Sequence, residues 1–395
     1  MISPFSFANI PHIIFGAGKL DDLYDIIPKF GNNVLFVIGG SSLNQSGKWN
    51  EIFSKLASKS INFASISISG EPSPSLIDEI TFKFRNKNLD LIVGIGGGSV
   101  TDAGKAISAM LTKDDSIKNY LEGVGNKVHD GKKVPYIAIP TTSGTGSEAT
   151  KNAVISEIGP DGFKKSLRHD NLIPNIAIID PKLMISCPPS ISAACGMDAF
   201  TQLLEAYVSS KASPMTDALA YSGIKFISEN LLLACSNGAS DVNIRTAMAY
   251  GSLMSGIALA NAGLGIIHGL ASPIGGFFKI PHGVVCGTLL FEATKMNIEI
   301  LQKQGIESKS TLRKYAQIGA LLAGECQVEE DRIGEYCAKL INTLEKWTDE
   351  LKIDRLGKYD IEIKDVNKIV ENVGLKNNPV KLNNENIKNI VLNRI

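Results

Sequence analysis

Several features are scarce or missing in this chain, and each absence excludes a class of protein. The 395 residues include only six cysteines, and none form a Cys-x-x-Cys pair, which excludes a zinc ribbon and a thioredoxin-like motif. Charge of one sign is not in excess either, because 40 Lys and Arg balance 40 Asp and Glu. The chain therefore has no global basic surplus, and we expect neither nucleic acid nor a membrane as a partner.

Long apolar runs are missing as well. No stretch of about 18 apolar residues is present, so the sequence predicts no membrane-spanning helix. The N-terminal segment lacks the basic start and the uninterrupted apolar core of a signal peptide. Apolar residues still make up 44% of the chain, enough for the cores of two domains. Together with the scattered thiols, these features predict a folded cytoplasmic protein.

The first 185 residues alternate short apolar runs with amphipathic segments. The runs lie at 34–38, 63–69, 89–95, 135–140 and 176–179. Apolar strands that alternate with helices predict a parallel sheet covered on both faces. Helical patterns dominate after Pro188. The sequence therefore predicts an α/β domain over residues 1–185 and an all-helical domain over residues 186–395.

Two loops rich in small residues follow predicted strands. Gly97, Gly98 and Ser99 end one strand and open a helix, where small residues and free N–H groups suit a pyrophosphate. The loop at 141–147 offers hydroxyl groups without bulk, and is either a flexible surface loop or a second wall of a nucleotide site. We favour the second reading, because ligands of parallel sheets bind where the carboxyl ends of the strands meet.

A third loop bears on the choice of cofactor. The first long strand ends in Gly39, Gly40 and Ser41, and no acidic residue stands beside them. In dinucleotide-binding folds an acidic residue near such a strand end holds the ribose diol. Its absence leaves room for a 2′-phosphate, so the sequence favours NADP(H) over NAD(H).

Two histidines and one acid form a candidate metal site. His268 and His282 lie beside prolines and glycines, and alone they are as readily explained as ordinary histidines. Asp198 lies in the most apolar predicted helix, where a lone acid is costly unless it is paired or bound to metal. Gln202 lies four residues later on the same helical face. Asp and His are sound ligands for a divalent cation, and an amide oxygen is a weaker one.

Five segments in this order resemble the iron-containing alcohol dehydrogenase family. They are GGGSVTDAGK at 96–105, IPTTSGTGSEAT at 139–150, LIPNIAIIDPKL at 172–183, GMDAFTQLLEAY at 196–207, and HGLASPIGG with PHG at 268–283. The resemblance implies a Rossmann-like nucleotide domain followed by a helical domain, as in dehydroquinate synthase-like folds. It also implies a homodimer, and hydride transfer between NAD(P)(H) and a small primary alcohol or aldehyde.

The same resemblance assigns roles to residues of the nucleotide domain. Gly97, Gly98 and Ser99 would hold the pyrophosphate. Asp102 would lie near the nicotinamide as part of the catalytic site. The remaining cofactor contacts fall on Thr141, Thr142, Ser147, Lys165 and Leu183.

In the helical domain the chain departs from the family pattern. The metal ligands of the family, one Asp and three His, fall by position on Asp198, Gln202, His268 and His282. A further family histidine, which helps in proton relay, falls on Ser272. We expect Fe²⁺ or Zn²⁺ to be held by Asp198 and the two histidines, with Gln202 as a weak fourth ligand. Proton relay through Ser272 should be slow, because a hydroxyl has no pKa near neutrality.

These departures leave three alternatives open. A metal-free NAD(P)H-dependent reductase similar to maleylacetate reductases would use His268, His282 or Lys165 as the proton donor. A non-redox lyase similar to dehydroquinate synthase would need more Lys and Arg than the cleft motifs offer. A non-catalytic NAD(P)-binding homologue would have lost its site with Gln202 and Ser272.

Overall fold

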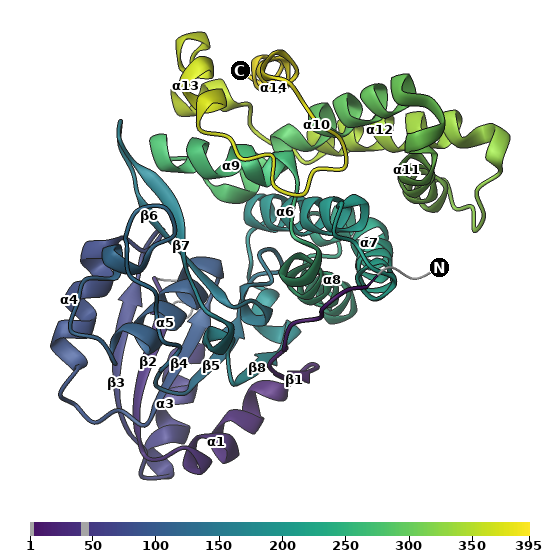
Figure 1. Ribbon diagram of the computed structural model, residues 1–395. Helices are drawn as coiled ribbons and strands as arrows, with labels where there is room; N and C mark the ends of the chain where they lie inside the picture. Colours follow the sequence, from purple (N-terminus) through teal and green to yellow (C-terminus); the bar gives the residue numbers. More distant parts are fainter. Residues whose placement is uncertain (1–3, 41–46) are drawn as a thin grey trace.

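A parallel sheet and a helical bundle lie against each other in this protein (Figure 1). The computed structural model describes residues 4–40 and 47–395, except for the side chains of residues 306 and 307. The sheet-bearing part ends near residue 184, and the first long helix of the bundle begins at Pro189. The α/β class and the helical second half that the sequence predicts are both confirmed.

Six parallel strands form the main sheet, in the order β1-β8-β5-β4-β2-β3. They are β1 (His12–Phe15), β2 (Asn33–Gly39), β3 (Asn62–Ile68), β4 (Leu91–Gly96), β5 (Tyr136–Pro140) and β8 (Ile176–Ile179). The helices around them are α1 (Leu23–Ile26), α3 (Lys48–Ser58), α4 (Pro74–Phe84) and α5 (Gly98–Met110). Because successive residues of a strand point to opposite faces, the apolar β2 feeds two cores. Leu35 and Val37 pack with α4 and α5. Phe36 and Ile38 pack with α1 and α3.

The order of the strands creates a switch point between β2 and β4. After β2 the chain adds β3 on one side, and then returns to add β4 on the other. The loops after two such strands run in opposite directions, which leaves a crevice at their carboxyl ends where ligands bind. Gly39 and Gly96 are the last residues of these two strands, so the glycine-rich loops begin at this crevice.

An antiparallel hairpin is not predicted from the sequence. It consists of β6 (Asn152–Glu157) and β7 (Phe163–Arg168), paired from Asn152 with Arg168 to Glu157 with Phe163. The hairpin packs on α5 through β6, and on the helical domain through β7. It therefore bridges the two domains.

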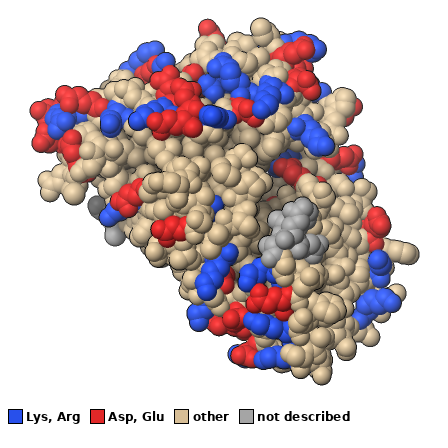
Figure 2. Space-filling view, turned by 180° about the vertical axis from the view of Figure 1, so that it is seen from behind, with Lys and Arg blue, Asp and Glu red and all other residues tan. Residues whose placement is uncertain are grey.

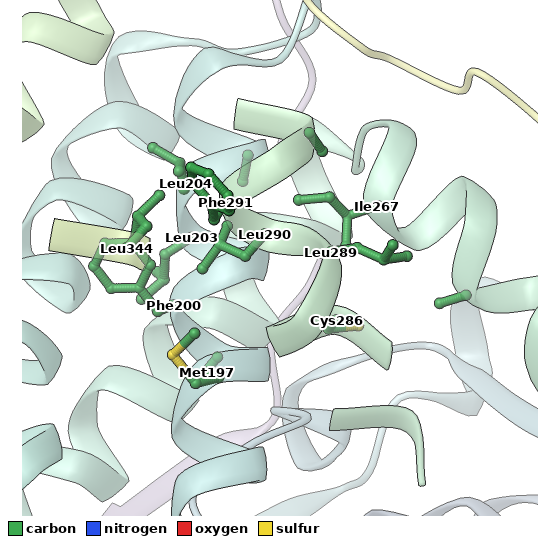
Figure 3. Packing of buried hydrophobic residues seen from close by; sticks show 14 of the residues in the cluster. Met197, Phe200, Leu203, Leu204, Ile267, Cys286, Leu289, Leu290, Phe291 and Leu344 are labelled. Atoms are coloured by element: carbon green, nitrogen blue, oxygen red, sulfur yellow. The ribbon is translucent and has the colours of Figure 1, made fainter. Parts of the chain in front are cut away.

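The helical domain is built around one central helix. Its long helices are α6 (Pro189–Val208), α7 (Pro214–Ala234), α8 (Val242–Ala262), α9 (Ile266–Phe277), α10 (His282–Gln304), α11 (Lys309–Leu322) and α12 (Ile333–Glu350). Two shorter helices follow, α13 (Val366–Glu371) and α14 (Asn384–Leu392). The central helix α6 packs against α7, α8 and α10. Figure 3 shows Phe200 and Leu203 of α6 among Leu289 and Leu290 of α10, in a core that also includes Leu344 of α12.

Short 3-10 helices complete the described elements. They are η1 (Lys19–Asp22), η2 (Ile27–Lys29), η3 (Ile117–Tyr120), η4 (Ser147–Ala149), η5 (Asp170–Leu172), η6 (Pro181–Met184), η7 (Gly305–Ser308), η8 (Glu330–Arg332), η9 (Leu356–Tyr359) and η10 (Ile363–Asp365). Within the described part of the chain, no single helix is long and apolar enough to cross a membrane; α8 and α9 reach that length and composition only as a pair bent by 99°. On the face shown in Figure 2, acidic and basic side chains lie interspersed, in line with the balanced charge.

Candidate active site

The glycine loop after β4 and the hydroxyl-rich loop after β5 are in contact. The backbone N–H of Thr141 donates to the carbonyl of Gly96 at 3.0 Å. A Cβ atom on Gly98 would lie 2.7 Å from Cγ2 of Thr145, and one on Gly97 would lie 3.4 Å from Oγ1 of Thr142. Glycine is thus required at 98 by the close approach of the second loop. Both predicted loops line one edge of the sheet.

The N-terminus of α5 opens at this edge. Gly97 is its N-cap, and no side chain of the described residues caps the helix there. Ser99 follows within the first turn. An uncapped helix start presents free N–H groups and the positive end of the helix dipole, which together suit a phosphate.

The end of β2 is not crowded by the residues that the structure describes. A Cβ atom on Gly39 would be in ordinary contact with Val100, and one on Gly40 would meet no atom of the described residues within 4 Å. The predicted contact Ser41 lies outside the described residues.

Asp102 and Ser147 join α5 to the hydroxyl-rich loop. The hydroxyl of Ser147 donates to Oδ1 of Asp102 at 2.5 Å. Nζ of the buried Lys105 lies 3.5 Å from the same oxygen, and donates to the carbonyls of Ser147 at 2.7 Å and of Asn152 at 2.6 Å. Burial raises the pKa of Asp102, while the charge of Lys105 opposes that shift. Lys105 therefore anchors the loop, and Asp102 is engaged with protein groups.

The remaining predicted cofactor residues, Thr142, Leu183 and Lys165, lie in three different parts of the domain. Thr142 lies beside Gly97, as described above. Leu183 is buried in η6, in the core beneath one face of the sheet. Lys165 is exposed on β7, and its neighbour Lys164 points to the opposite face of the hairpin, where its side chain is 9% exposed. The structure thus brings Lys164, rather than Lys165, toward the helical domain.

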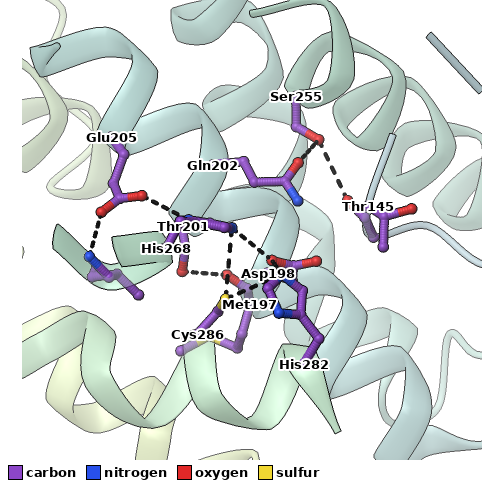
Figure 4. Close-up of polar contacts among 12 residues, drawn as sticks. Thr145, Met197, Asp198, Thr201, Gln202, Glu205, Ser255, His268, His282 and Cys286 are labelled. Carbon is purple, nitrogen blue, oxygen red and sulfur yellow. Dashed lines mark hydrogen bonds and ion pairs between the residues drawn. The ribbon is translucent and has the colours of Figure 1, made fainter. Parts of the chain in front are cut away.

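Four side chains converge where α6, α9 and α10 meet, three of them buried and the fourth, His282, partly exposed (Figure 4). Oδ1 of Asp198 lies 3.4 Å from Nε2 of His268 and 3.7 Å from Nε2 of His282. Sγ of Cys286 lies 3.6 Å and 3.7 Å from the same two nitrogens. All four ligand-type atoms are within 4.8 Å of one another. Three of the predicted ligands meet, and a cysteine joins them.

The local sequence explains this convergence. Asp198 lies on α6, which is buried by the core in Figure 3. His282 is the first residue of α10, and Cys286 follows four residues later on the same helical face. His268 lies in the first turn of α9. Three helices packed on one core thus hold the four side chains.

Asp198 and His282 each have a buried polar atom without a hydrogen bond, and each has a shifted pKa. Oδ1 of Asp198 and Nδ1 of His282 are buried without a hydrogen-bond partner among the described residues. Burial alone would raise the pKa of Asp198, but His282 and His268 hold it at about 2. Burial lowers the pKa of His282 to about 4, so its imidazole is neutral at pH 7. An ionised carboxylate oxygen that has no hydrogen bond, next to the neutral imidazole of His282, fits a cation in this position.

Glu205 orients His268 from behind. Oε2 of Glu205 lies 2.6 Å from Nδ1 of His268, and its Oε1 accepts from the backbone N–H of Ile267 at 2.7 Å. With Nδ1 of His268 held by this carboxylate, Nε2 faces the cluster, as in carboxylate–histidine–metal triads. Glu205 lies seven residues after Asp198 on α6, so one helix supplies both residues.

Gln202 and Ser272 are both used elsewhere. Oε1 of Gln202 accepts from the hydroxyl of Ser255 at 2.8 Å, and in Figure 4 the amide is turned toward Ser255. The hydroxyl of Ser272 donates to the carbonyl of Lys164 at 2.9 Å, which fastens α9 to the hairpin. Neither side chain is hydrogen-bonded to the four-residue cluster.

Family models match both halves of the chain. Residues 11–181 match "Iron-containing alcohol dehydrogenase", and residues 192–395 match "Fe-containing alcohol dehydrogenase family, C-terminal". The chain belongs to the iron-containing alcohol dehydrogenase family. It is accordingly an alcohol oxidoreductase, and the resemblance inferred from the sequence is confirmed.

Relatives within this family cover most of the chain. Long-chain-alcohol dehydrogenase 1 of Geobacillus thermodenitrificans is 38% identical over 285 residues, which are 72% of this chain and 71% of that protein. The NADPH-dependent butanol dehydrogenase of Clostridium saccharobutylicum is 30% identical over 391 residues, 96% of this chain and 95% of that protein. The crystal structure of a 1,3-propanediol oxidoreductase matches with a TM-score of 0.86 at 28% identity, covering 100% of both chains.

Four residues that border this alcohol dehydrogenase site are missed by sequence reasoning. They are Glu71, Lys164, Glu205 and Cys286. Glu71 forms a partly buried ion pair with Lys164 and accepts from the hydroxyl of Ser156 at 2.5 Å. Spacing alone could have revealed Glu205 and Cys286, which lie on the helical faces of Asp198 and His282. No local sequence pattern indicates Glu71 or Lys164, because Lys164 reaches the site on the hairpin and Glu71 is held there by its contacts with Ser156 and Lys164.

Proposed function

We propose that this protein transfers a hydride between NAD(P)(H) and a small primary alcohol or aldehyde, and that a divalent cation polarises the substrate oxygen. The buried Oδ1 of Asp198 carries the proposal, because it has no hydrogen bond among the described residues and faces Nε2 of His268 and of His282. An ionised carboxylate in such a place is costly without a compensating charge. When bound, the cation supplies Lewis-acid stabilisation of negative charge on oxygen, and the nicotinamide supplies or accepts the hydride.

The side chains of the cluster perform three tasks. Asp198, His268 and His282 bind the cation, and Glu205 fixes the orientation of His268. The apolar core around α6 and α10 keeps these ligands rigid. Ser272, one turn after His268, already donates its proton to a carbonyl, and provides at most a slow proton relay.

The loops at the carboxyl ends of β2, β4 and β5 bind the cofactor. Gly97, Gly98 and Ser99 at the start of α5 receive the pyrophosphate, as the uncapped N-terminus of this helix supports. Thr141 and Thr142 line the neighbouring loop. The absence of an acidic residue in the sequence directly after β2 supports a preference for NADP(H), and no described residue lies within 4 Å of a Cβ atom built at Gly40.

The experiment that tests this function is metal-dependent aldehyde reduction. The protein is stripped with a chelator, and NADPH oxidation with short-chain aldehydes is followed before and after Fe²⁺ or Zn²⁺ is added without oxygen. We expect activity to fall on stripping and to return with metal. Activity that is equal before and after stripping would refute the metal role and favour a metal-free reductase with protonated His268 as the donor. Burial alone would lower the pKa of His268, but Cys286, Asp198 and Glu205 raise it well above its ordinary value.

We also propose that the protein forms a homodimer through the edge of its sheet. Strand β1 is an edge strand that pairs only with β8 among the described residues. Before it, Phe5 and Ile10 expose 45% and 46% of their surface. An edge strand next to exposed apolar side chains is a template for pairing with a second copy. Ile10→Lys should shift the protein from dimer to monomer in analytical ultracentrifugation, and an unchanged dimer would refute this interface.

A further inference from the structure

We propose that Cys286 is the fourth protein ligand of the metal, which makes an Asp–His–His–Cys site that prefers zinc to iron. The proposal names the ligand set of the cation proposed above, and rests on that function for the presence of a cation. The thiol stands where α10 brings it, one turn beyond His282. It thus occupies the place in the coordination shell that Gln202 was expected to fill.

The distances fit a tetrahedral site. Metal bonds to nitrogen and oxygen are about 2.0–2.2 Å long, and a metal–sulfur bond is about 2.3 Å long. Tetrahedral angles then place oxygen and nitrogen about 3.3 Å apart, and nitrogen and sulfur about 3.6 Å apart. The two separations from Sγ of Cys286 to the imidazole nitrogens are 3.6 Å and 3.7 Å. The two from Oδ1 of Asp198 are 3.4 Å and 3.7 Å. These four separations are close to the values of a tetrahedral site, and all four atoms lie within 4.8 Å of one another.

The surroundings of the thiol point to the same role. Cys286 is fully buried, and its thiol contacts Nε2 of His268 and of His282, the two nitrogens that face the cluster. The carboxylate oxygen of Asp198 that faces the cluster is 2% exposed by residue and has no hydrogen bond. The Asp198 carboxylate is therefore a second, independent group that favours a cation at this position. The carbonyl oxygen of Gln202, in contrast, accepts a hydrogen bond from the hydroxyl of Ser255.

The donor set decides the choice of metal. One thiolate in place of an imidazole or an amide oxygen makes the site softer, and softer sites favour zinc over iron(II). Asp198 and the Cys286 thiolate together carry two negative charges, which balance a divalent cation in a buried place. On binding, the thiol releases its proton to solvent and its sulfur lone pair forms the bond to the metal, so no oxidant or reductant is needed.

Cobalt(II) tests the ligand directly, because a cobalt–thiolate bond gives a charge-transfer absorption band in the near ultraviolet. The full-length protein is stripped, loaded with Co²⁺ without oxygen, and compared with Cys286→Ser, Cys286→Ala and the control Cys337→Ser. Cys337 is a buried cysteine of α12 outside the cluster. We expect the band in the wild type and in Cys337→Ser, and its loss in both variants of Cys286. Circular dichroism confirms that each variant is folded.

A competition experiment measures the preference. Zinc affinity is determined against a chromophoric chelator, and we expect Cys286→Ser to weaken it by more than about 100-fold, because even partners behind the ligands cost 10- to 100-fold. The ratio of zinc to iron retained from an equimolar mixture should fall in the same variant. In Cys286→Ala, a second change, Gln202→His, should restore metal binding without the charge-transfer band.

The outcomes separate this inference from the proposed function. A wild-type protein that shows no band on binding Co²⁺, or binds none, overturns the inference, as does a band that persists in Cys286→Ser. Aldehyde reduction that depends on zinc but not on Cys286, without a band, would leave the proposed function standing and the inference refuted. A Cys286-dependent band in a protein that reduces no aldehyde would do the reverse.

Discussion

Replacing the buried Glu148 by glutamine should stabilise the protein at alkaline pH more than at acid pH. Glu148 lies in η4, next to the loop that Lys105 anchors, and is 3% exposed. Burial raises its pKa from 4.5 to about 7, and Lys105 offsets only part of that shift. Folding therefore favours the protonated form. This contribution is complete below pH 4.5 and is lost as the pH rises through about 7.

The size of the effect follows from linkage between these two pKa values. The ionisation of Glu148 costs the folded state about 0.8 kcal/mol at pH 5 and about 3.4 kcal/mol at pH 8, and glutamine has no such cost. The change in unfolding free energy caused by Glu148→Gln should therefore be about 2.5 kcal/mol more favourable at pH 8 than at pH 5.

Guanidinium unfolding followed by tryptophan fluorescence measures this difference, because Trp49 on α3 reports on the same domain. The matched control is Glu79→Gln, the same substitution at an exposed position of α4. If Glu148→Gln shifts the unfolding free energy equally at pH 5 and pH 8, the assignment of a raised pKa to Glu148 is refuted.

Three further changes test other parts of the structure. Gly40→Asp puts a negative charge at the end of β2, and should lower kcat/KM for NADPH relative to NADH by about tenfold or more, since 1.4 kcal/mol of repulsion suffices; an unchanged ratio would place the 2′-phosphate elsewhere. Gly256→Ala puts a methyl group 2.1 Å from the carbonyl oxygen of Gly146, and should lower the free energy of unfolding in guanidinium by about 1–3 kcal/mol. The control Gly334→Ala should not lower it, because a Cβ atom there meets no atom of the described residues within 4 Å. Asp198→Asn should remove bound metal, as measured by elemental analysis, and lower aldehyde reduction with it; retention of both would contradict the proposed site.

The parallel sheet could be predicted because its strands are buried on both faces and are apolar throughout. The hairpin could not, because Phe163–Arg168 holds two lysines, a serine and an arginine and lacks the apolar signal of a strand. Packing against α9 makes it a strand. The position of Lys164 has the same origin. Successive residues of a strand face opposite sides, so the sequence cannot indicate which of Lys164 and Lys165 faces the helical domain until that strand is recognised.

No helix is predicted from the sequence around His268, although Ile266–Phe277 forms α9. The segment contains Pro273 and three glycines, which lower helix propensity in isolation. Burial outweighs propensity here, because most of the helix is enclosed by the core. This helix gives His268 its direction toward Asp198, so the site could be predicted as a set of residues but not as a geometry.

The cysteine in this set shows how a local substitution can be misread. Met197, Phe200 and the apolar run around Cys286 look like a single core, and in such a run a cysteine behaves as a small hydrophobic residue. The sequence therefore predicts Gln202 on α6 as a weak fourth ligand in place of a histidine. In the folded chain α6 and α10 face each other, so a donor lost from one helix is matched by a donor on the other. The number of protein ligands is then unchanged, and what changes is their chemistry: an imidazole nitrogen on α6 is exchanged for a sulfur on α10, and with it the metal that the site selects.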